Sequence, residues 1–288
     1  MFTGSIVAIV TPFNANGSIN FDKLTELLEW HIAEGTNGIV VCGTTGESPT
    51  LSDEEQLAII SHTVKVINKR IPVIAGAGSN NSQHSLHLSQ AAEKAGADGL
   101  LLITPYYNKT NEEGLYQHFK TVAEKVNIPI ILYNVPSRTN MNIPINVLKR
   151  LAELKNIVAI KEASGNLDYV LKVAKEVPSL IILSGNDSQV IPILSLGGLG
   201  VISVFANVFP NAMSEMCAKY AKGELREAMT LQVKYTNFIE ALFIETNPIP
   251  VKEAMNLQGM NVGAYRLPLW EMSEKNKAIL VEELNKCK

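Results

Sequence analysis

Ile157-Val158-Ala159-Ile160-Lys161-Glu162 is an apolar stretch that ends in two charged residues, and its pattern decides how the rest of the chain is interpreted. Side chains alternate between the faces of a strand, so we expect Ile157 and Ala159 to share a face with Lys161. Lys161 then lies where a buried strand opens into a barrel or cleft. Burial disfavours the ammonium and lowers a lysine pKa, which leaves free amine to attack a carbonyl. The plainer alternative is a lysine that ends a strand and extends to water.

Seven further apolar stretches of similar length occur along the chain, with helix-like stretches between most of them. We expect strands at residues 5–11, 38–42, 72–76, 99–103, 129–133, 157–161, 180–184 and 200–204. The helix-like stretches cover residues 22–33, 52–68, 81–95, 112–126, 167–176 and 211–222. Strands that are apolar on both faces and alternate with helices indicate a parallel sheet covered by helices. Eight such units predict an α/β fold, a closed (β/α)8 TIM barrel of about 250 residues.

Local signals at the ends of these stretches support the same architecture. A Gly-x-x-Gly pattern at Gly35, Gly96 and Gly197 places a helix-ending glycine just before a strand. Ser52-Asp53-Glu54-Glu55 has the spacing of a capping box and marks the start of a helix. We predict two parts, a catalytic barrel over residues 1–223 and a C-terminal helical extension over residues 224–288.

A doubly wound sheet is the alternative architecture, and Gly76-Ala77-Gly78 after the third strand is its best support. The dinucleotide-binding fingerprint fails there, because Asn81 stands where the third glycine belongs. The closed barrel is therefore the preferred prediction.

The composition of the chain narrows its partners and its location. Its 288 residues hold 25 Lys and Arg against 28 Asp and Glu, a balance that favours neither nucleic acid nor an anionic membrane as a partner. Polar residues, glycine or proline interrupt every apolar run well before the roughly 18 residues of a membrane span. Cys42, Cys217 and Cys287 form no CxxC pair, as is typical of a reducing compartment. We expect a cytoplasmic protein without a signal peptide.

The residues that follow the expected strands are rich in hydroxyl groups, and in a barrel the chemistry lies at these strand ends. Thr44 and Thr45 follow the second strand, Tyr107 follows the fourth, and Tyr133 ends the fifth. The parity of Tyr133 within its strand predicts that it faces the same interior as Lys161. Schiff-base chemistry moves a proton at several steps, and hydroxyls can relay those protons. The plainer alternatives are a barrel-filling ring for Tyr133 and turn-forming hydroxyls for the two threonines.

Two charged residues and the histidines complete the set of candidates. Arg138 follows the fifth strand, where a guanidinium offers a planar fork to a substrate carboxylate, although a solvated surface arginine is the alternative. Glu47 is an acid or base candidate, but structural bonding to loop amides is the preferred interpretation. The five histidines lack the HExxH spacing of a zinc site and none follows a strand. We therefore predict no metal site.

Three stretches, in order along the chain, resemble a known family. Gly43-Thr44-Thr45-Gly46-Glu47, Tyr133-Asn134-Val135-Pro136-Ser137-Arg138-Thr139 and Ile160-Lys161-Glu162 are similar to motifs of the dihydrodipicolinate synthase and N-acetylneuraminate lyase family of class I aldolases. The likeness runs from the first strand into the C-terminal helices. With an arginine after Tyr-Asn-Val-Pro-x, this motif resembles that of the synthase branch rather than that of the sialic acid lyase branch.

The resemblance implies a catalytic role for four residues. Lys161 would form an imine with pyruvate, while Thr44, Tyr133 and Tyr107 would form a proton relay. Tyr107 would be lent across a tight-dimer interface. The family is usually a dimer of dimers, so the resemblance implies a homotetramer that needs no metal or organic cofactor.

It also implies which residues bind the substrates. Thr45 would bind the carboxylate of pyruvate through its amide and hydroxyl, and Arg138 would receive the carboxylate of L-aspartate-4-semialdehyde. Gly185 and Ile202 match positions whose backbone carbonyls face the site. The implied activity is a Schiff-base-forming lyase that makes 4-hydroxy-tetrahydrodipicolinate in lysine and diaminopimelate biosynthesis.

One departure from the family concerns inhibition by lysine. Lysine-inhibited members carry two histidines shortly after the Gly-Thr-Thr-Gly-Glu loop and a glutamate four residues beyond a Gly-x-Asn. Asp53, Gln56 and His84 stand at those positions here. Loss of the glutamate removes an anion for the amino groups of lysine, at about 1.5 to 3 kcal/mol for each charged hydrogen bond. We therefore predict weak or absent inhibition by lysine.

Two alternatives to the implied activity remain open. The first is a related pyruvate lyase acting on N-acetylneuraminate or on a 2-keto-3-deoxy sugar acid, against which Arg138 argues. The second is a catalytically silent member of the family that acts as a ligand-binding or regulatory protein.

Overall fold

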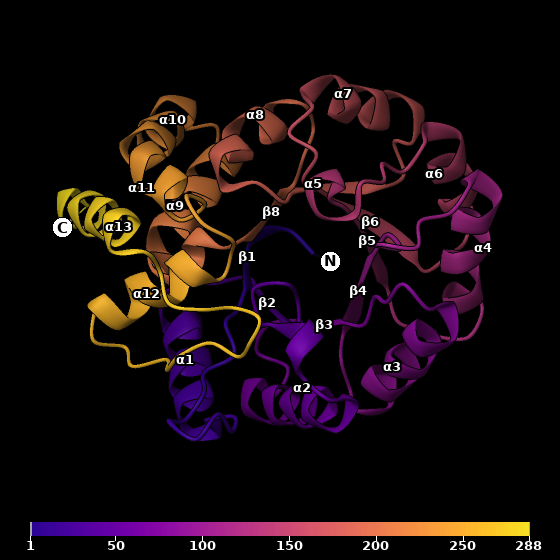
Figure 1. The fold of residues 1–288 in the computed structure, drawn as a ribbon. Helices are drawn as coiled ribbons and strands as arrows, with labels where there is room; N and C mark the ends of the chain where they lie inside the picture. The colour runs from indigo at the N-terminus through magenta and orange to yellow at the C-terminus, as the bar shows by residue number, and fades with distance from the viewer. Residues whose placement is uncertain (1, 288) are drawn as a thin grey trace.

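Eight parallel strands close into a barrel with helices around its outside, in a computed structural model that describes residues 2–287 (Figure 1). The strands are β1 (Gly4–Ala8), β2 (Gly38–Val41), β3 (Val73–Gly76), β4 (Gly99–Ile103), β5 (Ile130–Asn134), β6 (Ile157–Glu162), β7 (Ile181–Ser184) and β8 (Gly200–Ser203). They pair in sequence order, and β8 closes the barrel on β1, where Ile202 lies opposite Ile6. The predicted TIM barrel is confirmed, and the doubly wound alternative is wrong.

The helices between the strands follow the predicted pattern, with short additions. They are α1 (Phe21–Ala33), α2 (Asp53–Ile67), α3 (Ser82–Lys94), α4 (Glu112–Ala123), α5 (Pro136–Thr139), α6 (Ile145–Leu151), α7 (Leu167–Glu176) and α8 (Val190–Ser195), with the 3-10 turns η1 (Ser48–Thr50), η2 (Asp187–Gln189) and η3 (Phe205–Asn207). Ser52 and Glu55 form the predicted capping box at the start of α2. The sequence pattern missed α5, α6 and α8, because helices this short hold too few turns to show a period.

Five helices follow the last strand and gather on one side of the barrel, beside α1 (Figure 1). They are α9 (Pro210–Ala221), α10 (Leu225–Lys234), α11 (Thr236–Ala241), α12 (Ile249–Leu257) and α13 (Glu274–Lys286). Helix α10 packs on α9, and α11 and α12 pack on α13. The C-terminal helices therefore continue the outer layer of the barrel. A division into two parts after Gly223 stays a prediction.

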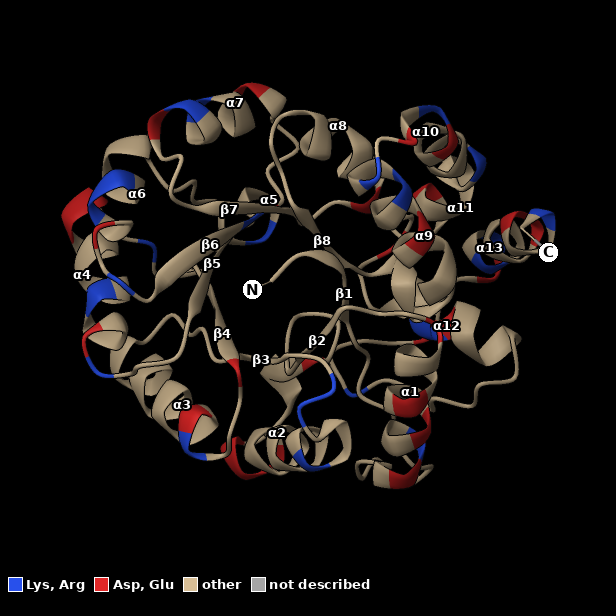
Figure 2. Ribbon diagram, turned by 180° about the vertical axis from the view of Figure 1, so that it is seen from behind, with Lys and Arg blue, Asp and Glu red and all other residues tan. Residues whose placement is uncertain are grey.

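Two apolar layers hold the fold together. An inner cluster fills the barrel with side chains such as Ile6, Ile74 and Leu183, and an outer cluster lies between the strands and the helices. The strands are almost free of charged residues, which gather on the surrounding helices (Figure 2). No helix within residues 2–287 is long and apolar enough to cross a membrane.

The parity predicted for β6 is correct at its carboxyl end and wrong at its start. Ala159 belongs to the inner cluster, but Ile157 packs in the outer cluster and Val158 packs against the inner one. The cause is a shift of register, because Ile130 and Ile131 of β5 lie opposite Ile157 and Ala159. The strand thus carries one extra residue, a β-bulge that a strict alternation cannot anticipate.

Candidate active site

Lys161 and Tyr133 lie opposite each other on the neighbouring strands β6 and β5, at the carboxyl end of the barrel. Lys161 is 5 % exposed, and its Nζ lies 4.3 Å from the centre of the Tyr133 ring. Burial lowers the pKa of Lys161 to about 8; the charge of Asp187 opposes this shift and that of Arg138 adds to it. At pH 7 about a tenth of this amine is therefore neutral. The predicted common interior of the two side chains is confirmed.

Tyr133 provides a protonated hydroxyl beside this amine. Burial raises the pKa of Tyr133 to about 12, while the charge of Arg138 and a hydrogen bond with Thr44 lower it. The phenol therefore keeps its proton at neutral pH and can donate it. Thr44 comes from the loop after β2, so the hydroxyl pair joins two strand ends that lie across the barrel mouth.

The loop after β2 turns back on itself and buries Thr45. The amides of Gly46 and Glu47 donate to the carbonyls of Gly43 and Thr44, at 3.1 Å in both cases. Thr45 is 2 % exposed, and its Oγ1 accepts a hydrogen bond of 3.1 Å from Nδ2 of Asn247. The hydroxyl proton of Thr45 is then free to point toward a ligand.

Arg138 lies on α5, exposed at the rim, and the same asparagine anchors it. Its Nη2 donates to the carbonyl oxygen of Asn247 at 3.1 Å. Asn247 thus contacts both predicted carboxylate-binding residues, Thr45 through its side chain and Arg138 through its backbone. In the sequence this asparagine is visible only as part of a break before a helix.

A cavity of about 400 Å³ opens at this end of the barrel and brings together three of the predicted site residues, Thr44, Tyr133 and Arg138. Its other lining residues are Cys42, Gly43, Ser48, Pro49, Leu51, Asp53, Gln56, Gly76, Gly78, Ser79, His84, Leu88, Leu101, Ile103, Tyr106 and Thr139. Lys161, Thr45, Gly185 and Ile202 are not among them, and neither is Tyr107. Its side chain is 92 % exposed on a backbone with φ of 68°, so within this chain it lies apart from the relay.

Gly185 and Ile202 lie on the far side of Lys161 from Tyr133. Gly185 follows β7, next to β6, and a Cβ placed on it would lie 3.2 Å from Cε of Lys161 and 2.7 Å from Cβ of Ala163. The glycine therefore leaves the space that the lysine occupies. Ile202 is fully buried in β8 as part of the inner cluster.

Two buried carboxylates hold the strand ends around Lys161, and the sequence assigned a role to neither. Asp187 accepts hydrogen bonds from the amides of Val204 and Phe205 at 3.0 and 2.9 Å, and burial raises its pKa. Glu162 accepts from Nδ2 of Asn134 at 2.7 Å, and burial raises its pKa also. Glu162 ends an apolar strand and Asp187 follows another by three residues, so an acidic residue at or just after a strand end is the sequence signal.

The interpretation of Glu47 needs correction. Its carboxylate does not bond to the amides of its own loop but forms a fully buried ion pair of 2.8 Å with Lys252 of α12. Its other oxygen accepts from the amide of Arg266 at 3.1 Å. Both partners come from more than 200 residues away, so no local pattern in the sequence reveals them.

The three residues that depart from the family pattern lie together along the cavity. Nε2 of His84 lies 2.9 Å from a carboxylate oxygen of Asp53, and Nε2 of Gln56 donates to the carbonyl of Ser48 at 3.2 Å. Across residues 2–287 no group of three or more His, Cys, Asp or Glu side chains is placed to hold a metal ion. The expectations on metal and cofactor stay predictions.

Known proteins resemble the chain over its whole length. A family model described as the dihydrodipicolinate synthetase family matches residues 1–287. A protein of Clostridium perfringens named 4-hydroxy-tetrahydrodipicolinate synthase is 55 % identical over 285 residues, covering 99 % of this chain and 98 % of the relative. A crystal structure of dihydrodipicolinate synthase from Aquifex aeolicus has a TM-score of 0.97 and 47 % identity, covering 99 % and 98 % of the two chains. The enzyme of Acinetobacter baumannii, solved in complex with pyruvate, has a TM-score of 0.97 and 44 % identity, covering 100 % and 99 %.

Proposed function

Because the chain belongs to the dihydrodipicolinate synthase family, we propose that it condenses pyruvate with L-aspartate-4-semialdehyde to 4-hydroxy-tetrahydrodipicolinate. It is a lyase of lysine and diaminopimelate biosynthesis. The observation that carries the proposal is Lys161, a buried lysine with a pKa of about 8, beside the protonated hydroxyl of Tyr133. This pair is what an amine nucleophile and its proton donor require.

In the proposed reaction, the neutral amine of Lys161 attacks the keto carbon of pyruvate. The resulting carbinolamine loses its hydroxyl as water, after a proton reaches it through Tyr133 and Thr44, and an imine forms. The methyl carbon then gives up a proton to form the enamine, which attacks the aldehyde carbon of the second substrate. Water or the product's own amine finally releases Lys161. Each step moves one proton, which is the task of the hydroxyl relay.

The substrate carboxylates have two separate receptors in this proposal. Thr45, held by Asn247, binds the carboxylate of pyruvate deep in the site. Arg138 binds that of the semialdehyde at the rim, where its guanidinium is exposed beside the cavity. The backbone carbonyls of Gly185 and Ile202 complete the pyruvate side. A fixed cation at the rim favours an aldehyde that carries a carboxylate close to the reacting carbon.

A coupled assay with both substrates tests this assignment. We expect turnover with pyruvate and L-aspartate-4-semialdehyde, unaffected by a chelator. Cleavage of N-acetylneuraminate or of a 2-keto-3-deoxy sugar acid, without condensation of the semialdehyde, would instead support the alternative lyase. Absence of any turnover, with ligand binding intact, would support the silent member.

Tyr107 carries the proposal that the active form is an oligomer, a homotetramer built as a dimer of dimers. Its exposed ring is available to a neighbouring subunit, which would complete the relay of Thr44 and Tyr133. Sedimentation at the concentration of the assay tests this, because a fully active monomer contradicts it. A cytoplasmic location remains part of the proposal, in keeping with the three free cysteines.

Weak or absent inhibition by lysine also remains a proposal. The carboxylate of Asp53 is paired with Nε2 of His84 along the cavity, and His84 itself brings no anion to the amino groups of lysine. Initial rates measured with increasing lysine test it. Halving of the rate by millimolar lysine would contradict it.

A further inference from the structure

Lys252 of α12 ties together three segments that lie far apart in the sequence. Its side chain is 0 % exposed, and its ammonium donates to three oxygens. These are the carboxylate of Glu47 at 2.8 Å, the carbonyl of Thr11 at 3.2 Å and the carbonyl of Ala264 at 2.5 Å. An ammonium has three hydrogens to donate, so each is used. The lysine thus joins the segment after β1, the loop after β2 and the C-terminal loop.

The residue that Lys252 holds has an unusual backbone. Glu47 adopts a left-handed conformation, with φ of 57° and ψ of 34°, and so does Cys42 at the other end of the loop, with φ of 53°. Residues other than glycine persist in this region only where the surrounding structure fixes them. Between these two positions lie Thr44 and Thr45. The shape of the loop that carries Thr44 and Thr45 therefore depends on contacts made from outside it.

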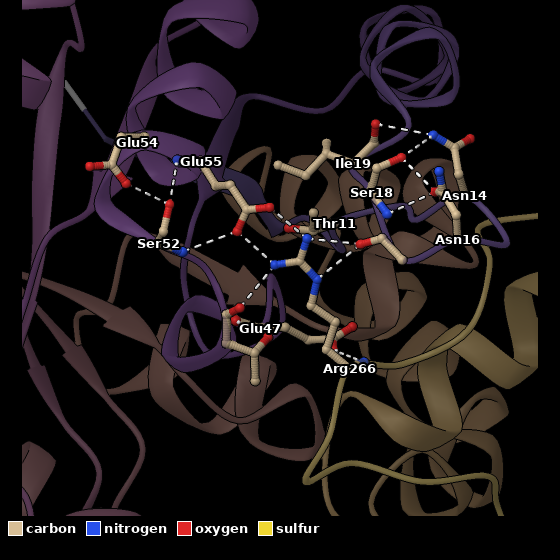
Figure 3. Close-up of polar contacts among 12 residues, drawn as sticks. Thr11, Asn14, Asn16, Ser18, Ile19, Glu47, Ser52, Glu54, Glu55 and Arg266 are labelled. Atoms are coloured by element: carbon tan, nitrogen blue, oxygen red, sulfur yellow. Dashed lines mark hydrogen bonds and ion pairs between the residues drawn. The ribbon is translucent and has the colours of Figure 1, made fainter.

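A second bond from the C-terminal loop supports the same carboxylate. The amide of Arg266 donates to Glu47, while its guanidinium lies between the carboxylate of Glu55 and the carbonyls of Gly17 and Thr50 (Figure 3). Both guanidinium contacts with Glu55 measure 2.6 Å. Glu47 is thus held from two points of the C-terminal region, through Lys252 and through the backbone at Arg266.

We propose that Lys252 is a positioning residue for the condensation, acting through Glu47 to fix the Thr44–Thr45 loop against Lys161. The inference rests on the proposed function, because it assigns the loop to pyruvate binding and proton relay. It predicts that loss of the Lys252 ammonium impairs imine formation without touching the amine that forms the imine. The C-terminal region is then part of the catalytic apparatus, through Lys252 and through Asn247, whose side chain bonds to Thr45.

The test compares Lys252→Met with a variant that is destabilised elsewhere. Leu148→Ala removes a fully buried side chain of α6, in the outer cluster and away from the loop. Both variants lower the melting temperature. We expect only Lys252→Met, measured well below its melting temperature, to lose kcat/KM for pyruvate, by about tenfold to a hundredfold. Its KM for the semialdehyde, which Arg138 binds, changes less.

A double variant keeps the proposal testable if Lys252→Met fails to fold. Glu47→Gln with Lys252→Met leaves no unpaired buried charge, so we expect it to regain thermal stability but not kcat/KM for pyruvate. Wild-type kcat/KM in either folded variant overturns the proposal, as does an equal loss in Leu148→Ala. A wild-type protein that cannot be trapped with pyruvate and borohydride contradicts the proposed function instead.

Discussion

Lys161 and Lys252 are both buried lysines, and the surroundings of their ammonium groups differ in one decisive respect. Lys252 is matched by a carboxylate and two carbonyl oxygens. Lys161 has an aromatic ring within 4.3 Å, and its amine forms no hydrogen bond or ion pair with the residues that the structure describes. Burial lowers the pKa of both, but only at Lys252 does a directly bonded carboxylate oppose it. Desolvation without a bonded partner makes a nucleophile, and desolvation with partners makes a structural link.

The largest expected effect separates the two lysines by activity. Lys161→Met removes the amine that forms the imine, so we expect kcat to fall by about a thousandfold or more, as for other enzymes that lose a nucleophile. The measurement is the coupled assay on purified protein. Retention of a tenth of the activity would show that another group forms the covalent intermediate.

Lys161→Met and Lys252→Met should change the free energy of unfolding in opposite directions. The lowered pKa of Lys161 means that the folded state holds the proton less well than the unfolded chain, a cost fully present below pH of about 8 and lost as the pH approaches 10.5. Lys161→Met should therefore stabilise the fold at pH 7, by at most about 3 kcal/mol. Lys252→Met leaves Glu47 buried without its partner and should cost about 3 to 5 kcal/mol.

Urea unfolding of the three proteins at pH 7 and pH 10 measures this contrast. The gain in free energy of unfolding that Lys161→Met brings over the wild type should shrink at the higher pH. Destabilisation of similar size by both substitutions would mean that Lys161 is also held by structural contacts, and the distinction between the two lysines would be lost.

Arg138 sharpens the comparison, because its charge acts on Lys161 and on the substrate together. Arg138→Ala should raise KM for the semialdehyde by about ten to a hundredfold, the equivalent of one charge-assisted hydrogen bond. It should also raise the pKa of Lys161, since the guanidinium lowers it. Arg138→Lys is the matched control, because it keeps the positive charge and loses the planar guanidinium fork. An unchanged KM in Arg138→Ala would remove its assigned role.

The last contrast is between Lys161 and an ordinary lysine, in the pH dependence of imine formation. With the pKa of Lys161 at about 8, the neutral fraction of the amine rises about ninefold from pH 6 to pH 7, about fivefold from pH 7 to pH 8, and levels off above pH 9. The measurement is the rate of inactivation by borohydride with saturating pyruvate, between pH 6 and 9.5. A rate that still rises tenfold per unit above pH 9 would indicate a lysine with an ordinary pKa.

Much of the fold and part of the site could be predicted because their signals are local. Short apolar strands, helix-ending glycines and a capping box recur along the chain, and the parity of Lys161 and Tyr133 needs only neighbouring residues. The bulge at Val158 lies outside such patterns, since it arises from the pairing of β5 with β6. The contacts of Lys252 with Glu47 and of Asn247 with Thr45 span more than 200 residues, so only the closed barrel brings them together.

Trapping with borohydride and pyruvate tests the central claim most directly, with the modified residue located by peptide mass spectrometry. We predict that one reduced pyruvate is added at Lys161, that Lys252 stays unmodified, and that activity is lost in proportion to the label. An adduct on Lys252 or any other lysine, or a protein that remains unmodified and fully active, would contradict the account.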